Sequence, residues 1–466
     1  MTITDMVTRL QDKAGLLRQL GFVSATALVV SNMVGMGIFT TTGFMARDLG
    51  SAPVILAVWL VGALFALAGA LSYSELGINF PSSGGEYVYL TRAFGPAWGF
   101  MTGWVSFFAG FSAPIAAAAL AFSDYLGYFY APLKQANAAH TLGSGALALH
   151  FGGGQVVACV LIAAFSILNC LGVRRTARVQ NLLTGMKLAV IIGFVVTGFL
   201  SGAGSWHHFS EPAVRGATTS LPAQFVISLL WVMVAYSGWN AATYVAEELK
   251  RPERTLPAAL AAGTALVTAL FIALNLVFIY STPLESMKGV LAVGSLAASN
   301  LFGPQVAGTF SALMALSLMA TVNAEVTIGP RVYYAMAKNK AFFQVAANVH
   351  PEWHTPVVAI LSQAVCAMVL TLTPFPQLVV YIGFSLTFFS VLSVASVLIF
   401  RRRPGWQKLR ALSIGYPAIP LLYILVGACM IVYGIVWQPV ASAGALATIG
   451  AGAAVWAAFG RRDAKP

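Results

Sequence analysis

The sequence predicts an all-α integral membrane protein with twelve transmembrane helices, in which two inverted five-helix repeats are followed by two further helices. Charged residues make up only 9% of the 466 residues, whereas a soluble globular protein carries about 25%. Hydrophobic residues make up 59% and gather in runs of the length, about 20 residues, that crosses a bilayer. These runs are continuously apolar, so they exclude an outer-membrane β-barrel, whose strands alternate.

Twelve apolar runs can each form one membrane span. Polar or glycine- and proline-containing stretches separate them. The spans are expected at residues 22–47, 52–79, 97–128, 153–172, 180–202, 223–248, 257–280, 303–337, 355–373, 377–400, 415–437 and 441–459.

The lysines and arginines predict the orientation in the membrane. With the N-terminus inside, 22 of the 26 basic residues lie in cytoplasmic stretches or near their helix ends, and 4 lie outside. This bias places both termini in the cytoplasm and indicates the inner membrane. The net charge of +12 therefore reflects topology and contact with the lipid bilayer, not nucleic-acid binding. Arg401–Arg403 is expected to anchor the chain at the inner headgroups.

No motif indicates an enzyme, a metal or a cofactor. The four cysteines all lie in apolar runs, where we expect buried free thiols. His350 and His354 are four residues apart, but Pro351 stands where a zinc protease needs its glutamate. We find no phosphate-binding loop and no nucleophile–base pair, so catalytic residues, metal ligands and cofactors are all expected to be absent.

The first apolar run is interrupted at residues 32–39, where Gly35 and Gly37 weaken the helix in mid-membrane. A helix broken there leaves carbonyls unpaired at the end of its first half and amides unpaired at the start of its second. Such a site can hold an ammonium group and a carboxylate together. The alternative is that these glycines only allow close helix packing.

A second interruption, at residues 234–240, lies in the sixth span. Broken helices five spans apart indicate two inverted repeats, and breaks at matching positions predict the binding site of a secondary transporter. The chain then divides into a cytoplasmic N-terminal segment, a first repeat, a second repeat, two appended helices and a cytoplasmic tail: residues 1–20, 21–202, 223–400, 411–460 and 461–466.

Four motifs together resemble a known family. They are Gly35-Met36-Gly37-Ile38-Phe39; Phe80–Tyr87 followed by Phe94-Gly95-Pro96; Tyr236–Asn240 followed by Glu247, Glu248 and Pro252; and Asn323 followed by Gly329–Ala337. As a set they resemble amino acid–polyamine–organocation (APC) superfamily permeases, in particular the L-type amino acid transporter branch. The resemblance covers about residues 20–400. It implies ten core helices in two inverted repeats and transport of amino acids by alternating access.

The resemblance also implies roles for the two interruptions. The site would comprise Met33, Gly35, Met36, Gly37, Val234, Ala235 and Ser237. The amides of Met36 and Gly37 would bind the substrate carboxylate, and the carbonyls of Met33, Val234 and Ser237 would bind its ammonium group. Helix dipoles favour this arrangement without a charged side chain.

Two positions depart from the branch. A small residue is usual where Met36 stands, and Met36 narrows the space near the substrate α-carbon. The branch often has a bulky aromatic residue at the position of Val234, and that residue covers the substrate. Valine covers less, so other side chains are expected to close over the substrate. Gating or pocket-lining residues are expected among Tyr236, Trp239, Phe111 and Phe384, although Trp239 could equally be a packing residue.

Lys187 and Glu325 lie inside predicted spans. Lys187 could extend to the cytoplasmic headgroups; the resemblance implies instead that its ammonium replaces a sodium ion between helices 1 and 8, which predicts sodium-independent transport. Glu325 could carry a coupling proton, pair with Lys187 or face a polar cavity.

The apolar pocket residues favour neutral amino acids, whereas a cationic amino acid or polyamine becomes the better candidate if Glu325 lines the pocket. The alternative class of function is a non-transporting membrane sensor or a channel. Exchange, proton symport and uniport remain open, as does the oligomeric state.

Overall fold

The computed structural model describes residues 20–81, 84–143, 148–338, 342–353 and 355–460. The predicted terminal segments, residues 1–20 and 461–466, fall outside this range except for Leu20. Almost every described element is a helix, and one short hairpin, β1 (His140–Leu142) with β2 (Leu149–Phe151), accompanies them.

Helices of the first half of the chain follow the predicted runs closely. They are α2 (Phe22–Met33), α3 (Met36–Leu49), α4 (Ala52–Asn79), α5 (Glu86–Phe94), α6 (Pro96–Val105), the π-helix η1 (Ser106–Ser112), α7 (Ala113–Leu126), α8 (Gly153–Cys170) and α9 (Val173–Leu200). Helices α6, η1 and α7 form one continuous span.

The second half contains more short elements. They are α10 (Leu221–Ala235), the 3₁₀ helix η6 (Ala241–Glu248), α11 (Pro252–Ser281), α12 (Leu284–Met287), α13 (Val293–Phe302), α14 (Pro304–Lys338), α15 (Val357–Leu370), α16 (Phe375–Phe400), α17 (Arg410–Ile414), α18 (Ala418–Trp437) and α19 (Pro439–Val455), which continues as the π-helix η8 (Trp456–Gly460).

The chain is a multi-span helical membrane protein. Nine of the described helices are long and apolar enough to cross a bilayer, and the bent pair α2–α3 makes a tenth span. In the predicted spans 223–248 and 355–373, the structure has the shorter helices α10 and α15. Helix α10 is short because the backbone turns after Ala235, and α15 begins only after Pro356.

Three local expectations differ from the structure. Residues 241–248 form a 3₁₀ helix and not the α-helical continuation of the sixth span. Helix α9 begins at Val173, seven residues before the predicted span. Helix α13 lies between predicted spans, in a connection for which no helix was expected.

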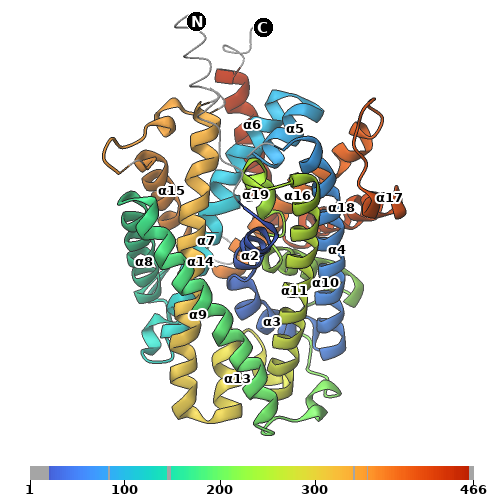
Figure 1. Cartoon of the computed structure of the whole chain (residues 1–466). Coiled ribbons are helices and arrows are strands. Elements are labelled where there is room, and N and C mark those ends of the chain that lie inside the picture. The colour runs from blue at the N-terminus through green and yellow to red at the C-terminus, as the bar shows by residue number, and fades with distance from the viewer. Residues whose placement is uncertain (1–19, 82–83, 144–147, 339–341, 354, 461–466) are drawn as a thin grey trace, which may run out of the picture.

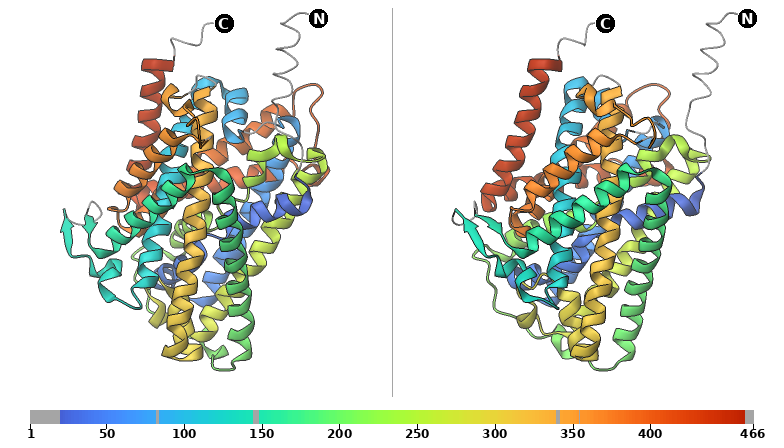
Figure 2. Two further views of the ribbon diagram at one scale, coloured as in Figure 1. Left: turned by 60° about the vertical axis from the view of Figure 1, so that its left-hand side comes forward. Right: turned by 90° about the vertical axis from the view of Figure 1, so that its left-hand side faces the viewer.

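Most helices run along one direction, between an end that carries α5 and an end that carries α13 (Figures 1 and 2). Helix α11 packs along α4 and α2, while α14 packs along α7 and α9. The interrupted pair α2–α3 lies in the middle of this arrangement (Figure 1). The hydrophobic core surrounds it and includes Val29, Met33, Ile38 and Phe39.

A buried ion pair fixes one end of α4. Glu75 is fully buried, and its carboxylate accepts hydrogen bonds from Arg401 Nε (2.6 Å), Trp406 Nε1 (2.8 Å) and the Leu409 amide (3.0 Å). The Arg401 guanidinium also stacks on the Tyr416 ring, 4.0 Å from its centroid. Arg401 therefore binds inside the protein and does not extend to the lipid headgroups, in contrast to the sequence-based expectation.

Loss of one partner from this pair leaves a buried charge uncompensated. We expect Glu75→Gln to destabilise the protein by about 3–5 kcal/mol, measured as a lower midpoint of thermal unfolding of the purified protein. Glu285→Gln is the matched control because Glu285 is exposed and pairs with Lys288 at the surface. Equal melting temperatures for both variants would contradict a stabilising role for the buried pair.

Candidate functional site

The first interruption lies at Val34 and Gly35. Helix α2 ends at Met33, and α3 begins at Met36 after the extended Gly35 (φ −117°, ψ −156°). The two helices of this span meet at 41°. The first amides of α3 have no acceptor within their own helix, so they remain available to bind an anionic group.

The second interruption comprises residues 236–240. Helix α10 ends at Ala235, and η6 begins at Ala241. Gly238 has φ +98°, a conformation that is strained for any residue with a Cβ. Ser237 secures the turn, because both its amide (3.1 Å) and its Oγ (2.7 Å) donate hydrogen bonds to Val234 O.

The two interruptions and the helix ends that flank them contact each other directly through their backbones. A Cβ placed on Gly37 would lie 2.4 Å from Ala235 Cα, and one placed on Gly238 would lie 2.8 Å from the Asn32 carbonyl carbon. Glycine is therefore required at both contacts. The sequence places these two stretches in different halves of the chain, and the fold brings them together.

Several predicted binding groups already have partners within the protein. Met33 O accepts the Gly35 amide at 2.8 Å, and Val234 O accepts both Ser237 donors. A carbonyl oxygen has two lone pairs. Met33 O can therefore accept one more hydrogen bond in this conformation, whereas Val234 O becomes available once Ser237 Oγ rotates away.

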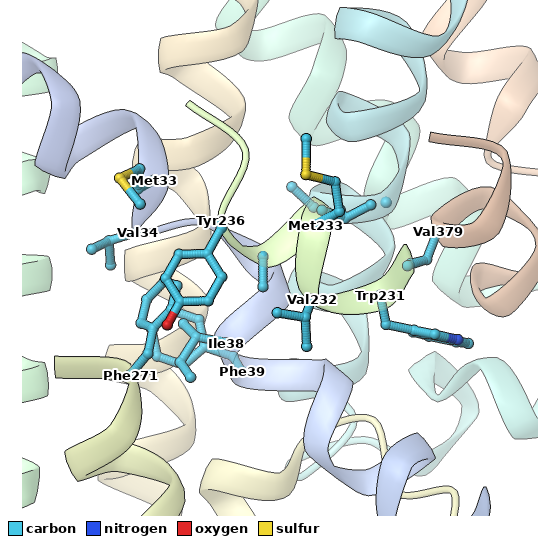
Figure 3. Close-up of a cluster of buried hydrophobic side chains, with 14 of the residues drawn as sticks. Met33, Val34, Ile38, Phe39, Trp231, Val232, Met233, Tyr236, Phe271 and Val379 are labelled. Carbon is cyan, nitrogen blue, oxygen red and sulfur yellow. The ribbon is translucent and has the colours of Figure 1, made fainter. Parts of the chain in front are cut away.

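Side chains from both interruptions pack into one buried apolar cluster (Figure 3). Met33, Val34 and Ile38 come from the first, and Tyr236 lies beside Phe271 of α11. The centroids of the Tyr236 and Phe271 rings are 5.2 Å apart. The site is thus enclosed by hydrocarbon around a small number of polar backbone groups.

The four aromatic residues expected to gate or line the pocket lie in different places. Tyr236 donates a hydrogen bond to Trp59 O (3.4 Å), and Trp239 packs edge-on against Tyr73 of α4. Phe384 is fully buried beside Gly434 of α18. Phe111 packs against Tyr333 of α14. The structure does not bring these four side chains into one pocket.

Lys187 joins the first interruption to α14. Its side chain is buried, and Nζ donates hydrogen bonds to Val34 O (2.5 Å) and Thr321 Oγ1 (3.1 Å). The carbonyl of Val34, which the break deprives of a helical partner, is therefore satisfied by an ammonium group. This position excludes an extension of Lys187 to the headgroups in this conformation.

Glu325 lies one turn after Thr321 on α14 and is partly buried. Its backbone carbonyl accepts a hydrogen bond from Gln363 Nε2 (3.3 Å). Among the side chains that the structure describes, no ion pair joins Glu325 to Lys187 within 4.0 Å.

A polar network between α8, α9 and α14 was not expected from the sequence. Asn323 donates to Gln180 Oε1 (2.7 Å) and accepts from Asn169 Nδ2 (3.0 Å). Thr327 Oγ1 donates to Asn169 Oδ1 (2.7 Å). Asn323 was noted only as part of a family motif, and its partners lie more than 140 residues away along the chain.

Glu86 was also missed as a functional candidate. Its Oε1 accepts hydrogen bonds from Tyr73 Oη (2.7 Å) and from Asn240 Nδ2 (3.2 Å). Glu86 thereby links α5 and α4 to the second interruption. Glu86 follows a polar connection in the sequence, and such a position gives no sign that the carboxylate is partly buried.

Comparison with known proteins identifies the family. The profile of the amino acid permease family matches residues 20–458. The chain belongs to this family. The permease is 31% identical to the serine/threonine exchanger SteT of Bacillus subtilis over 88% of this chain and 89% of that protein. It is 28% identical to the human large neutral amino acids transporter small subunit 2, over 91% of this chain and 77% of that protein.

A solved structure has a similar fold. The crystal structure of MhsT in complex with L-phenylalanine matches with a TM-score of 0.61 at 13% identity and covers 90% of this chain and 99% of that one. The family profile and the relatives confirm the resemblance to APC superfamily permeases. The chain is an amino acid transporter of that superfamily, and the family is one of transporters and not of enzymes.

The contact between the interruptions leads to a specific prediction. In Gly37→Ala the new methyl group would overlap Ala235, so we expect the uptake rate to fall about tenfold or more, as for overpacking by 1–3 kcal/mol. Gly185→Ala is the control, because a Cβ at Gly185 of α9 meets no atom within 4 Å. The uptake rates of both variants are measured in proteoliposomes. A wild-type rate for Gly37→Ala would show that the close contact between Gly37 and Ala235 is not needed for transport.

Proposed function

We propose that this permease exchanges neutral amino acids across the cell membrane by alternating access, independently of sodium. The direct contact between the two helix interruptions, Gly37 against Ala235, is the observation that carries this proposal. It supports a shared binding site made from both halves of the chain. The names of the relatives, an exchanger of serine and threonine and a transporter of large neutral amino acids, support the same substrate class.

The membrane topology that we propose has twelve spans, with α10–η6 and α15 as the sixth and ninth. Residues 21–202 and 223–400 form the two inverted repeats, and 411–460 hold the last two spans. The predominance of basic residues on one side supports a cytoplasmic location for both termini and for α5. The face of the bundle at α5 is then the inner face.

The substrate would lie between the interruptions with its carboxylate at the amides of Met36 and Gly37. Its ammonium group would lie at the carbonyls of Met33, Val234 and Ser237. Neither break supplies an ionised side chain, so the zwitterion is neutralised by helix-end dipoles. Because Gly37 and Ala235 touch in this conformation, substrate entry requires the two backbones to separate, which couples binding to movement.

Lys187 supports sodium independence. Its ammonium contacts the broken backbone at Val34 and the hydroxyl of Thr321 on α14, so a covalently attached cation would occupy the place of a coupling ion. The partly buried Glu325 on the same helix is the one feature that favours a proton-coupled variant or a cationic substrate. Its charge interacts with that of Lys187, but no ion pair within 4.0 Å joins the two among the described side chains.

If the protein is an exchanger, its transport rate should depend on the presence of substrate on both sides of the membrane. Proteoliposomes preloaded with labelled L-serine or L-leucine should release label rapidly only when the same amino acid is added outside. Release that is equally fast without external substrate would favour a uniporter, and flux that does not saturate would favour a channel. A melting-temperature screen against the amino acids identifies the substrate to use, because ligands that bind the native state raise this temperature.

Sodium independence and the role of Lys187 can be tested together. Replacing sodium by choline should leave uptake unchanged. Lys187→Met should reduce uptake about tenfold or more, because it leaves the buried Val34 carbonyl without its donor, at a cost of about 1–3 kcal/mol. Lys250→Met, which removes an exposed lysine, is the control. Collapse of wild-type uptake in choline would refute the proposed sodium independence.

A further inference from the structure

Two small cavities adjoin each other near the α5 end of the bundle. Each has a volume of about 10 Å³, enough for one water molecule or a group of similar size. Glu86, Thr102 and Ser106 line both of them. Ser385 of α16 completes the first cavity, and Tyr244 of η6 borders the second.

The polar groups of these cavities suit a positively charged donor. Glu86 is the one charged residue among the described residues that line them. Ser385 is fully buried, and its Oγ has no hydrogen-bond partner among the described atoms. Ser106 begins the π-helix η1, an irregularity that occurs frequently at functional sites.

Among the residues that the structure describes, no cation compensates the charge of Glu86. Burial raises the pKa of Glu86, while its hydrogen bonds from Tyr73 and Asn240 oppose this effect. Four tyrosines lie near its charge, namely Tyr73, Tyr89, Tyr244 and Tyr423, and a neutral tyrosine supplies no positive charge. No lysine, arginine or histidine of the described chain forms an ion pair with it. A carboxylate in such surroundings is stabilised by a cation that enters the cavity.

The site is continuous with the second interruption. Asn240, which shares Glu86 Oε1 with Tyr73, follows Ser237 by three residues. A substrate that leaves the interruptions towards α5 therefore meets Glu86 next. An ammonium group is similar in size to a water molecule and donates three hydrogen bonds, which suits the carboxylate and the free hydroxyl. The cavity holds that group alone, so the α-carbon of a substrate enters only when the surrounding helices separate.

We propose that Glu86 and Ser385 form a second, transient substrate site, which binds the primary ammonium group of the amino acid between the helix interruptions and the α5 face. This site rests on the proposed transport function and extends it to the release step. The Glu86 carboxylate repels the substrate carboxylate, so the amino acid passes with its ammonium group towards the α5 face. It also sets the affinity on that face independently of the affinity on the other.

The test measures the Michaelis constant separately on each face. The full chain is reconstituted in liposomes of uniform orientation, and exchange of labelled L-serine, or of L-leucine where the wild type prefers it, is followed with either face limiting. Glu86→Gln should raise KM about tenfold on the α5 face, as expected for loss of a charged hydrogen bond, and leave KM on the other face unchanged. Ser385→Ala should cause a smaller increase on the same face.

Tyr73→Phe is the matched control. It removes one hydrogen bond to Glu86 Oε1 but keeps the carboxylate, so both KM values should stay at the wild-type level. An equal increase in Tyr73→Phe and Glu86→Gln would reduce Glu86 to a structural role and overturn the proposal. Two further results for Glu86→Gln would overturn the proposal, provided that this variant has the wild-type melting temperature. They are an unchanged KM on the α5 face and an equal increase in KM on both faces.

Ser385→Ala keeps the proposal testable if Glu86→Gln does not fold. The Ser385 hydroxyl forms no hydrogen bond with the described atoms, so its removal breaks no interaction within the protein. An unchanged KM of Ser385→Ala on the α5 face would then overturn the proposed site. Failure of the proposed transport function looks different, because the wild type itself would show no saturable exchange of any amino acid.

Discussion

The structure depends on how backbone polar groups are satisfied where two helices are broken inside an apolar interior. Unpaired amides and carbonyls are costly in the absence of water. At the first break, the Val34 carbonyl is satisfied by Lys187, and the Met33 carbonyl by the Gly35 amide. At the second, Ser237 supplies two donors to Val234. Each break is therefore stabilised locally, with some hydrogen-bonding capacity left for a substrate.

Because the two breaks are in close contact, the backbone conformation of each break restricts the positions of the helices around it. Gly37 and Gly238 have no Cβ, and each lies against the backbone of the other break. A substrate that enters between them must separate elements that also contact α4, α11 and α16. Helix rearrangement therefore accompanies occupancy, because packed interiors shift between discrete arrangements instead of deforming continuously.

The sequence predicted the local features of the fold better than the contacts between distant residues. The positions of the helices and of both breaks follow from apolar runs and from glycine in mid-membrane, which are local signals. The partner of Lys187 does not: the family resemblance implied a place for its ammonium between helices 1 and 8, but nothing in the local pattern selects Thr321, which is 134 residues away. The orientation of Tyr236 and Trp239 towards α4 depends on packing against Trp59, Tyr73 and Gly69, which periodicity alone does not specify.

The same limitation applies to the charged residues, whose individual partners the sequence did not predict. Arg401 belongs to a basic cluster that indicates orientation, yet the fold turns it inwards to neutralise Glu75. Glu86 follows Glu75 by eleven residues and is partly buried, and its described neighbours are hydroxyl and amide donors. A structural carboxylate is stabilised best by a permanent cation. One that has only neutral donors retains the capacity to bind a cation that comes and goes, and in a transporter of zwitterions the ammonium group of the cargo is such a cation.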